Sequence, residues 1–161
     1  MNAVARVYVA VVGPSAASAE EERVASDVGR LLAGRGAIVV TGGLDGVMAA
    51  ASRGAREAGG TTLGMLPGTD RTGANPWVDV AVPTGMGEAR NALVVRTADG
   101  VIAVGGEYGT LSEIALALKL GRPVVGIGTW ELSRAGSANA DVGIARAPDA
   151  DEAVRLLFER L

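Results

Sequence analysis

The sequence predicts an α/β fold, in the form of a single Rossmann-like, doubly wound and mainly parallel sheet flanked by helices. Short apolar runs rich in Val, Ile and Ala alternate with segments of helix length, which indicates right-handed βαβ units. Several of these runs are continuously apolar, as in parallel strands that are covered on both faces. The 24 glycines are spread along the chain, as expected for many tight corners between strands and helices.

Six strands are expected where short β-branched or apolar runs are bounded by turn-forming residues. In chain order they are Arg6–Val12, Ala37–Thr41, Thr61–Leu66, Val78–Val82, Gly100–Val104 and Pro123–Ile127.

Five helices are expected between and after these strands. They are Ala19–Ala33, Gly46–Ala58, Glu88–Thr97, Thr110–Leu120 and Ala150–Leu161. Ser18 with Glu21 forms the pattern of a capping box before the first helix, and Asp149 with Glu152 is a similar pattern before the last. Gly34 and Gly121 stand where helices commonly end.

Two segments are predicted to be loops. Pro67–Trp77 is rich in turn-forming residues, and Trp130–Asp141 consists mostly of small and polar residues. Long loops in compact domains are often functional, so either segment can fold over a site.

The composition limits the possible functions. The 161 residues favour one domain, spanning residues 1–161. With 15 basic and 18 acidic residues the formal net charge is −3, which argues against a nucleic-acid partner. The chain has no cysteine and no histidine, which excludes disulfides, thiol nucleophiles and a Ser-His-Asp triad and leaves no usual zinc ligands. We therefore expect no metal site.

No segment has the pattern of a secretory signal or of a transmembrane helix, because no apolar run reaches about 18 residues. We expect a cytoplasmic protein without a membrane partner.

The most informative segment is the glycine-rich corner from Gly105 to Glu113, which joins an expected strand to an expected helix. Such a corner brings backbone N–H groups and the positive end of the helix dipole close to an anion. The candidate contacts to a phosphate group are Gly106, Glu107, Tyr108, Gly109 and Thr110. Alternatively, Thr110 to Glu113 is a capping box in which the Glu113 carboxylate only caps the helix.

Three further segments are candidates for the same site. A second strand-to-helix corner holds Gly42, Gly43 and Gly46, which alternatively form only a tight turn capped by Asp45. Arg90 falls near the start of a helix, where the dipole disfavours a cation unless an anion lies close. Its alternative is an ordinary exposed arginine.

The remaining candidates are Met86, which lies in the segment before Arg90, and Ser15, which follows the first strand. A helix-entry turn explains Ser15 equally well. The two common nucleotide motifs, G-x-G-x-x-G after the first strand and G-x-x-x-x-G-K-[ST], are absent. Lys119 lies about 13 Å along its helix from Thr110, so a pyridoxal-phosphate enzyme such as a lysine decarboxylase is not expected.

Together these corners resemble the LOG (Lonely Guy) superfamily, whose members are often mislabelled lysine decarboxylases. The family signature P-G-G-x-G-T-x-x-E resembles residues 105–113, and its G-G-x-x-G-[LVI]-M resembles residues 42–48. The family's catalytic arginine, 23 residues before the motif glutamate, falls on Arg90. The resemblance extends from the first strand to about Ile127.

The chain departs from this signature at three positions. Gly105 replaces the motif proline, Glu107 replaces a motif glycine, and Asn91 replaces the lysine that follows the arginine in cytokinin-activating members. The chain looks closer to the short bacterial branch related to molybdenum-cofactor carrier proteins.

The resemblance implies a phosphorylated small-molecule ligand and two possible activities. The first is hydrolysis of the N-glycosidic bond of a nucleoside 5′-monophosphate, in which Arg90 and Glu113 are catalytic. We favour it slightly because both residues are present, and it needs no cofactor. The alternative is a carrier that holds molybdenum cofactor or a similar phosphorylated pterin without turnover. The family also implies a homodimer or a higher homo-oligomer, with the Ala-rich helices near Ala49–Ala58 and Ala115–Leu120 at the interface.

Overall fold

The structure is a computed structural model that describes residues 5–138 and 143–161. Its centre is a seven-stranded sheet with the order β4-β3-β2-β1-β5-β6-β7. Every neighbouring pair of strands is parallel. The strands are β1 Tyr8–Val12, β2 Ile38–Thr41, β3 Thr61–Leu66, β4 Val80–Pro83, β5 Gly100–Val104, β6 Val124–Ile127 and β7 Ile144–Arg146. The predicted α/β fold with a parallel sheet is confirmed.

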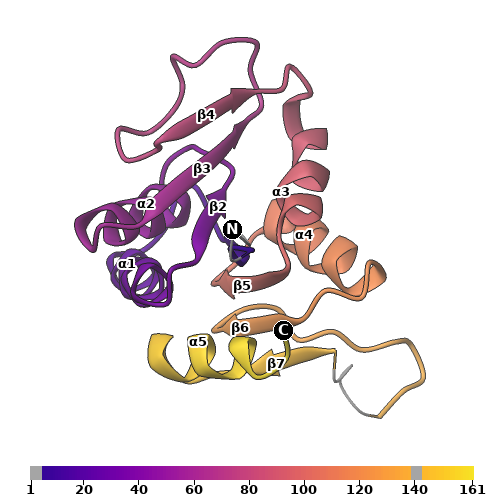
Figure 1. Ribbon diagram of the computed structural model, residues 1–161. Helices are drawn as coiled ribbons and strands as arrows, with labels where there is room; N and C mark the ends of the chain where they lie inside the picture. Colours follow the sequence, from indigo (N-terminus) through magenta and orange to yellow (C-terminus); the bar gives the residue numbers. More distant parts are fainter. Residues whose placement is uncertain (1–4, 139–142) are drawn as a thin grey trace.

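Helices cover both faces of the sheet, as Figure 1 shows. Strand residues Val9 and Val11 pack with α1, α2 and α5 on one face. Their neighbours Ala10 and Val12 pack with α3 and α4 on the other. The helices are α1 Ala19–Gly34, α2 Val47–Glu57, a 3-10 helix η1 Gly87–Arg90, α3 Asn91–Thr97, α4 Tyr108–Lys119 and α5 Ala150–Phe158.

Two elements in the second half of the chain differ from the sequence prediction. A seventh strand, β7, lies at one edge of the sheet and was not predicted. The loop of residues 67–79 joins the parallel strands β3 and β4, which confirms the predicted loop Pro67–Trp77. The helix expected from Thr110 begins two residues earlier, at Tyr108. The predicted loop Trp130–Asp141 has no helix or strand over residues 130–138, and its last residues lie outside the described part of the chain.

The predicted helix ends are partly confirmed. Ser18 and Glu21 form both hydrogen bonds of a capping box. Asp149 accepts a hydrogen bond from the Glu152 N–H, but the Glu152 carboxylate accepts from Arg155. Gly121 has the left-handed φ of +70° that ends a helix, whereas at the end of α1 this conformation is taken by Gly36 and not by Gly34.

Two glycines bring α1 and α2 into backbone contact. A Cβ atom at Gly29 would lie 2.0 Å from the Ala51 carbonyl oxygen, and one at Gly54 would lie 1.9 Å from the Ser26 carbonyl oxygen. Both distances are far shorter than any van der Waals contact. Ala51 and Ala55 of α2 are fully buried beside this contact. The small residues of α2, which the sequence assigned to a subunit interface, therefore pack largely against α1. The oligomeric state stays a prediction.

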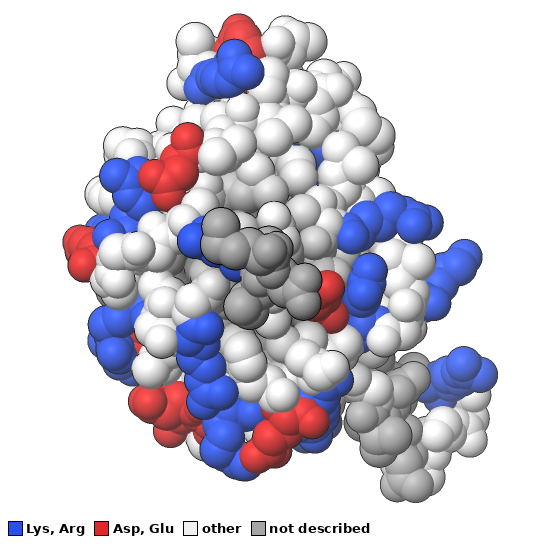
Figure 2. All heavy atoms as spheres, in the orientation of Figure 1, with Lys and Arg blue, Asp and Glu red and all other residues white. Residues whose placement is uncertain are grey.

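The charged residues of α1 and α5 form ion pairs along each helix. Arg23 pairs with Glu20 and Asp27 on α1, and Arg155 pairs with Glu152 and Glu159 on α5. Figure 2 shows blue and red side chains intermixed along the left and lower edges, where α1, α2 and α5 lie. Exposed pairs of this kind contribute little to stability. Within residues 5–138 and 143–161, no helix has the length and apolar character needed to cross a membrane.

The contact between α1 and α2 predicts that an added methyl group lowers the free energy of unfolding at one glycine of α1 and not at another. Gly29→Ala should lower the free energy of unfolding by about 1–3 kcal/mol, because the new Cβ atom would push against main-chain atoms. Gly34→Ala, on the same helix, meets nothing within 4 Å and should be neutral or stabilising by up to about 1 kcal/mol. Urea unfolding of the two variants measures the difference. Equal effects would contradict the close contact.

Candidate functional site

A pocket of about 630 Å³ opens at the carboxyl ends of the strands. Its walls come from the segments that follow β1, β2, β3 and β5, and from η1 and the start of α3. β1 and β5 are the neighbouring strands between which the order of the sheet reverses, and open α/β sheets bind ligands at such a point. The lining residues are Gly13, Pro14, Ser15, Leu44, Met48, Pro67, Glu88, Arg90, Asn91, Glu107, Tyr108, Gly109, Thr110, Ser112 and Glu113.

The amino end of α4 forms one wall of the pocket. Its N-cap is Glu107, whose side chain caps nothing. Within the described residues, the N–H groups of Tyr108, Gly109 and Thr110 have no hydrogen-bond partner, as expected for the first turn of an α-helix. These three donors and the helix dipole favour an anion. Thr110 is nearly buried and lines the pocket beside them.

Arg90 forms part of another wall, and its guanidinium is held by the backbone. Its Nε donates to the carbonyl oxygen of Met65 at 2.7 Å, and Nη2 donates to that of Gly42 at 3.3 Å. Nη1 donates to the Asn91 side-chain oxygen. A guanidinium has five N–H groups, so these bonds leave two for a ligand. Arg90 is only 8% exposed, which contradicts the alternative of an ordinary exposed arginine.

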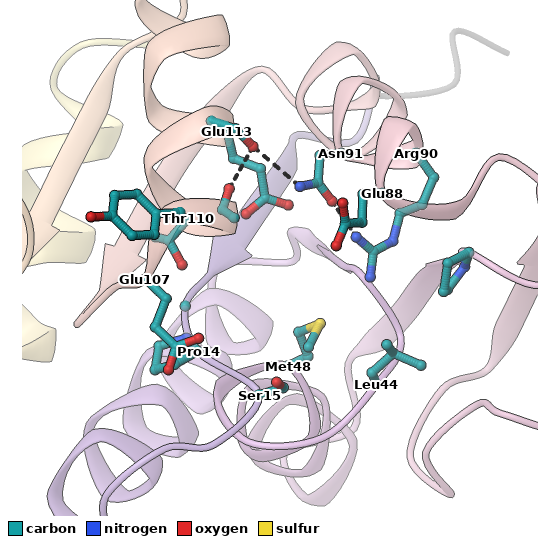
Figure 3. Close-up of a pocket in the computed structure, with 15 residues that line it drawn as sticks. Pro14, Ser15, Leu44, Met48, Glu88, Arg90, Asn91, Glu107, Thr110 and Glu113 are labelled. Carbon is teal, nitrogen blue, oxygen red and sulfur yellow. Dashed lines mark hydrogen bonds between the residues drawn. The ribbon is translucent and has the colours of Figure 1, made fainter.

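Asn91 connects this guanidinium to α4. While its side-chain oxygen accepts from Arg90, its Nδ2 donates to the Ser112 hydroxyl at 3.2 Å. Ser112 in turn donates to the carbonyl oxygen of Gly109 at 2.6 Å. This chain of hydrogen bonds links Arg90 to the first turn of α4, and a dashed line in Figure 3 marks the bond that Asn91 donates toward α4.

Glu113 is the buried acidic group of the pocket. It is 7% exposed, and no described residue donates a hydrogen bond to its carboxylate. Because α4 begins at Tyr108, Glu113 lies beyond the first turn and does not cap the helix. Figure 3 shows its carboxyl group facing the space between α4 and Arg90. The capping alternative for Glu113 is therefore wrong.

The two buried charges of the pocket affect each other without direct contact. Burial raises the pKa of Glu113 to about 8, and the positive charge of Arg90 opposes this shift only in part. Burial also lowers the pKa of Arg90, while the charges of Glu113 and Glu88 act in the opposite direction. Arg90 and Glu113 form no salt bridge. At neutral pH the buried part of the pocket thus holds a cationic guanidinium and a largely protonated carboxyl group.

The second glycine corner holds a site residue, Arg90, in place by a hydrogen bond to its backbone. Gly42 does not line the pocket, but its carbonyl oxygen accepts a hydrogen bond from Arg90. The Gly43 N–H donates to the Thr41 hydroxyl and is not available to a ligand. Gly46, with a left-handed φ of +62°, is the N-cap of α2, and the Asp45 side chain caps nothing. The corner contributes the side chains of Leu44 and Met48 to the wall instead, as Figure 3 shows.

The structure brings most of the predicted site residues into this one pocket, namely Ser15, Glu107, Tyr108, Gly109, Thr110, Arg90 and Glu113. Met86 is 46% exposed and does not line the pocket. Gly106 lines a smaller adjacent cavity. Leu44, Met48 and Ser112 are wall residues that the sequence does not reveal, since apolar and hydroxyl side chains carry no motif of their own.

Comparison with known proteins places this arrangement in a family. Residues 6–154 match the SLOG cluster4 family. An uncharacterised protein of Archaeoglobus fulgidus is 41% identical over 121 residues, which cover 75% of this chain and 80% of that protein.

Two solved structures resemble the fold over almost their whole length. The molybdenum cofactor binding protein of Rippkaea orientalis is 32% identical, with a TM-score of 0.86 and 98% of both chains covered. The molybdenum cofactor carrier protein of Chlamydomonas reinhardtii is 33% identical, with a TM-score of 0.83, 97% of this chain covered and 98% of that one.

The raised pKa of Glu113 predicts a specific pH dependence of stability. The folded protein keeps this proton up to about pH 8, whereas the unfolded chain releases it near pH 4.5. The free energy of unfolding should therefore fall as the pH rises through this window, by roughly 2–5 kcal/mol. Glu113→Gln should abolish that part of the fall and be the more stable protein at pH 8.5.

Denaturant unfolding between pH 5 and pH 9 measures the effect. Glu88→Gln is the matched control, because it removes an exposed carboxylate from the same pocket and should leave the pH profile unchanged. Parallel profiles for Glu113→Gln and the unsubstituted protein would contradict a buried, protonated Glu113.

Proposed function

The chain belongs to the SLOG cluster4 family, and we propose that it is a non-catalytic carrier of molybdenum cofactor or a similar phosphorylated pterin. The observation that carries this proposal is the likeness to the Rippkaea orientalis molybdenum cofactor binding protein over 98% of both chains. The likeness to the Chlamydomonas reinhardtii carrier protein supports it independently of that structure.

The hydrogen-bond donors of the pocket support the proposal, because they can bind the phosphate group of the cargo. The N–H groups of Tyr108, Gly109 and Thr110 and the Thr110 hydroxyl are the donors on the α4 side. The two remaining N–H groups of Arg90 would complete the site from the facing wall. Hydrogen bonds to a charged acceptor contribute about 1.5–3 kcal/mol each, so a few of them suffice to hold a small anion.

The protonation state of Glu113 favours a protein that holds a ligand over one that cleaves it. Stabilisation of an oxocarbenium-like transition state needs a carboxylate, but Glu113 is largely protonated at neutral pH. A bound phosphate close by would favour the protonated form further. The neutral carboxyl group does not repel an anionic cargo, and it can donate a hydrogen bond to it.

Hydrolysis of a nucleoside 5′-monophosphate is the second candidate. Arg90 and Glu113 line the same pocket, and this observation favours it. A protonated Glu113 can act as a general acid toward a departing base. This activity requires turnover, whereas a carrier requires only retention.

The carrier proposal is tested with cofactor released from a molybdoenzyme. The purified protein is mixed with the released cofactor and passed through a size-exclusion column under anaerobic conditions. The expected result is coelution of molybdenum and pterin with the protein, and slower loss of the cofactor than in buffer. Separate elution, with loss at the rate seen in buffer, would refute the proposal.

Thr110→Val then tests where the phosphate group binds. The substitution removes a buried hydroxyl and keeps the shape of the side chain, so we expect roughly tenfold weaker cargo binding with little change in stability. Thr97→Val makes the same substitution at the carboxyl end of α3, at a residue that does not line the pocket, and should leave binding unchanged. Equal affinities for the two variants would place the phosphate group elsewhere.

Glu113→Gln separates the two candidate functions. A carrier should bind its cargo at least as well after this substitution, and the advantage of the variant should grow above pH 8, where Glu113 ionises and repels an anion. A hydrolase should lose release of free base from AMP and similar monophosphates. Chromatographic measurement of base release and of cargo affinity on the same protein sample distinguishes these outcomes.

A further inference from the structure

Two of the few aromatic residues of the chain lie together at the rim of the pocket. The sequence has 2 Trp, 2 Tyr and 1 Phe. The rings of Tyr108 and Trp130 have centroids 5.7 Å apart and are tilted by 35°. Tyr108 is 81% exposed, although burying an aromatic ring stabilises a fold strongly. We call this pair the aromatic shelf.

One ring of the aromatic shelf, that of Trp130, is held in place by the backbone and the core. The Trp130 indole N–H donates to the Glu107 carbonyl oxygen at 3.2 Å. The ring of Trp130 also packs against the core on the α3–α4 side of the sheet. A Cβ atom at Gly106 would lie 3.0 Å from the indole nitrogen, so the backbone before α4 is shaped to admit this ring. Trp130 is therefore a fixed surface and not a freely rotating side chain.

The aromatic shelf bounds a second cavity that adjoins the first. This cavity of about 460 Å³ is lined by Gly106, Glu107, Tyr108, Gly109 and Trp130. Three of these residues, Glu107, Tyr108 and Gly109, also line the main pocket. The unpaired N–H groups of α4 thus lie between the two cavities. One molecule with an anionic end and a flat end can occupy both.

We propose that the aromatic shelf binds the planar heteroaromatic ring of the same ligand whose phosphate group lies at the amino end of α4. This inference deepens the proposed function and rests on it for the phosphate position. Stacking on a π-face tolerates any flat ring. The aromatic shelf therefore accounts for binding of a pterin or a purine, and it places the ring in the second cavity, which Arg90 does not line.

The test uses the intrinsic fluorescence of Trp130. The Trp77→Phe variant leaves Trp130 as the single tryptophan, while the Trp130→Phe variant leaves Trp77, which lies beside Arg53 on α2. The ring-bearing probes are neopterin monophosphate and AMP. Ribose 5-phosphate is the probe without a ring, and neopterin and adenosine are the probes without phosphate.

We expect at least one of the two ring-bearing phosphates to change the emission of Trp130 and to leave that of Trp77 unchanged. Ribose 5-phosphate should raise the Tm without changing either emission. Tyr108→Ala should weaken binding of the responding phosphate about 3- to 10-fold and leave binding of ribose 5-phosphate unchanged. Tyr108→Phe keeps the ring and should restore the affinity. Because Tyr108 is exposed, these variants should fold normally.

The outcomes that overturn the inference differ from those that overturn the proposed function. Binding of the ring-bearing phosphates without any response of Trp130, or with equal losses for ring-bearing and ringless probes in Tyr108→Ala, overturns the aromatic shelf alone. A response to neopterin or adenosine with no binding of ribose 5-phosphate overturns the phosphate site alone. A change of oligomeric mass in Tyr108→Ala, with affinity unchanged, would assign the pair to an interface between copies and overturn the inference. No binding of any probe overturns both.

Discussion

The hydrogen bonds from Arg90 to the carbonyl oxygens of Met65 and Gly42 determine how the candidate site is built. These carbonyl groups belong to Gly42, which directly follows β2, and to Met65, the last residue but one of β3. A buried guanidinium satisfies them and, through Asn91 and Ser112, joins the sheet to the first turn of α4. The charged group that we propose to attract a ligand is thus also the group that positions the pocket walls. Loss of Arg90 would affect folding and binding together.

The two buried ionisable groups of the pocket differ, because one keeps its charge and the other does not. Arg90 stays cationic at any physiological pH, whereas Glu113, buried without a hydrogen-bond donor, titrates near pH 8. A site that must stabilise positive charge in a substrate would keep its carboxylate ionised by pairing it closely with a cation or with N–H donors. Here the donors of α4 are left for a ligand and the carboxyl group stays neutral. This electrostatic arrangement agrees with retention of an anionic molecule better than with its cleavage.

Local patterns in the sequence were sufficient to predict the sheet and the gathering of Arg90, Thr110 and Glu113 in one pocket, because glycine corners after parallel strands converge at one edge. They were not sufficient for β7, a strand of three residues with no clear periodicity. Nor do they show which N–H groups remain free: the Gly43 N–H is used by the Thr41 hydroxyl, a contact decided by the geometry of the turn. The link from Trp130 to Glu107 spans 23 residues, and no local pattern encodes it.

The paired glycines of α1 and α2 have a genetic consequence. At Gly29 and Gly54 an added methyl group would clash with main-chain atoms of the other helix. Because every residue has these main-chain atoms, no second substitution can remove them. Suppressor mutations that replace a neighbouring side chain with a smaller one rescue many overpacked cores. At Gly29 and Gly54 they would not relieve the clash, because the clash is with the main chain. Revertants selected from a damaged Gly29 or Gly54 allele should be true revertants, or should carry global stabilisers far from the two helices.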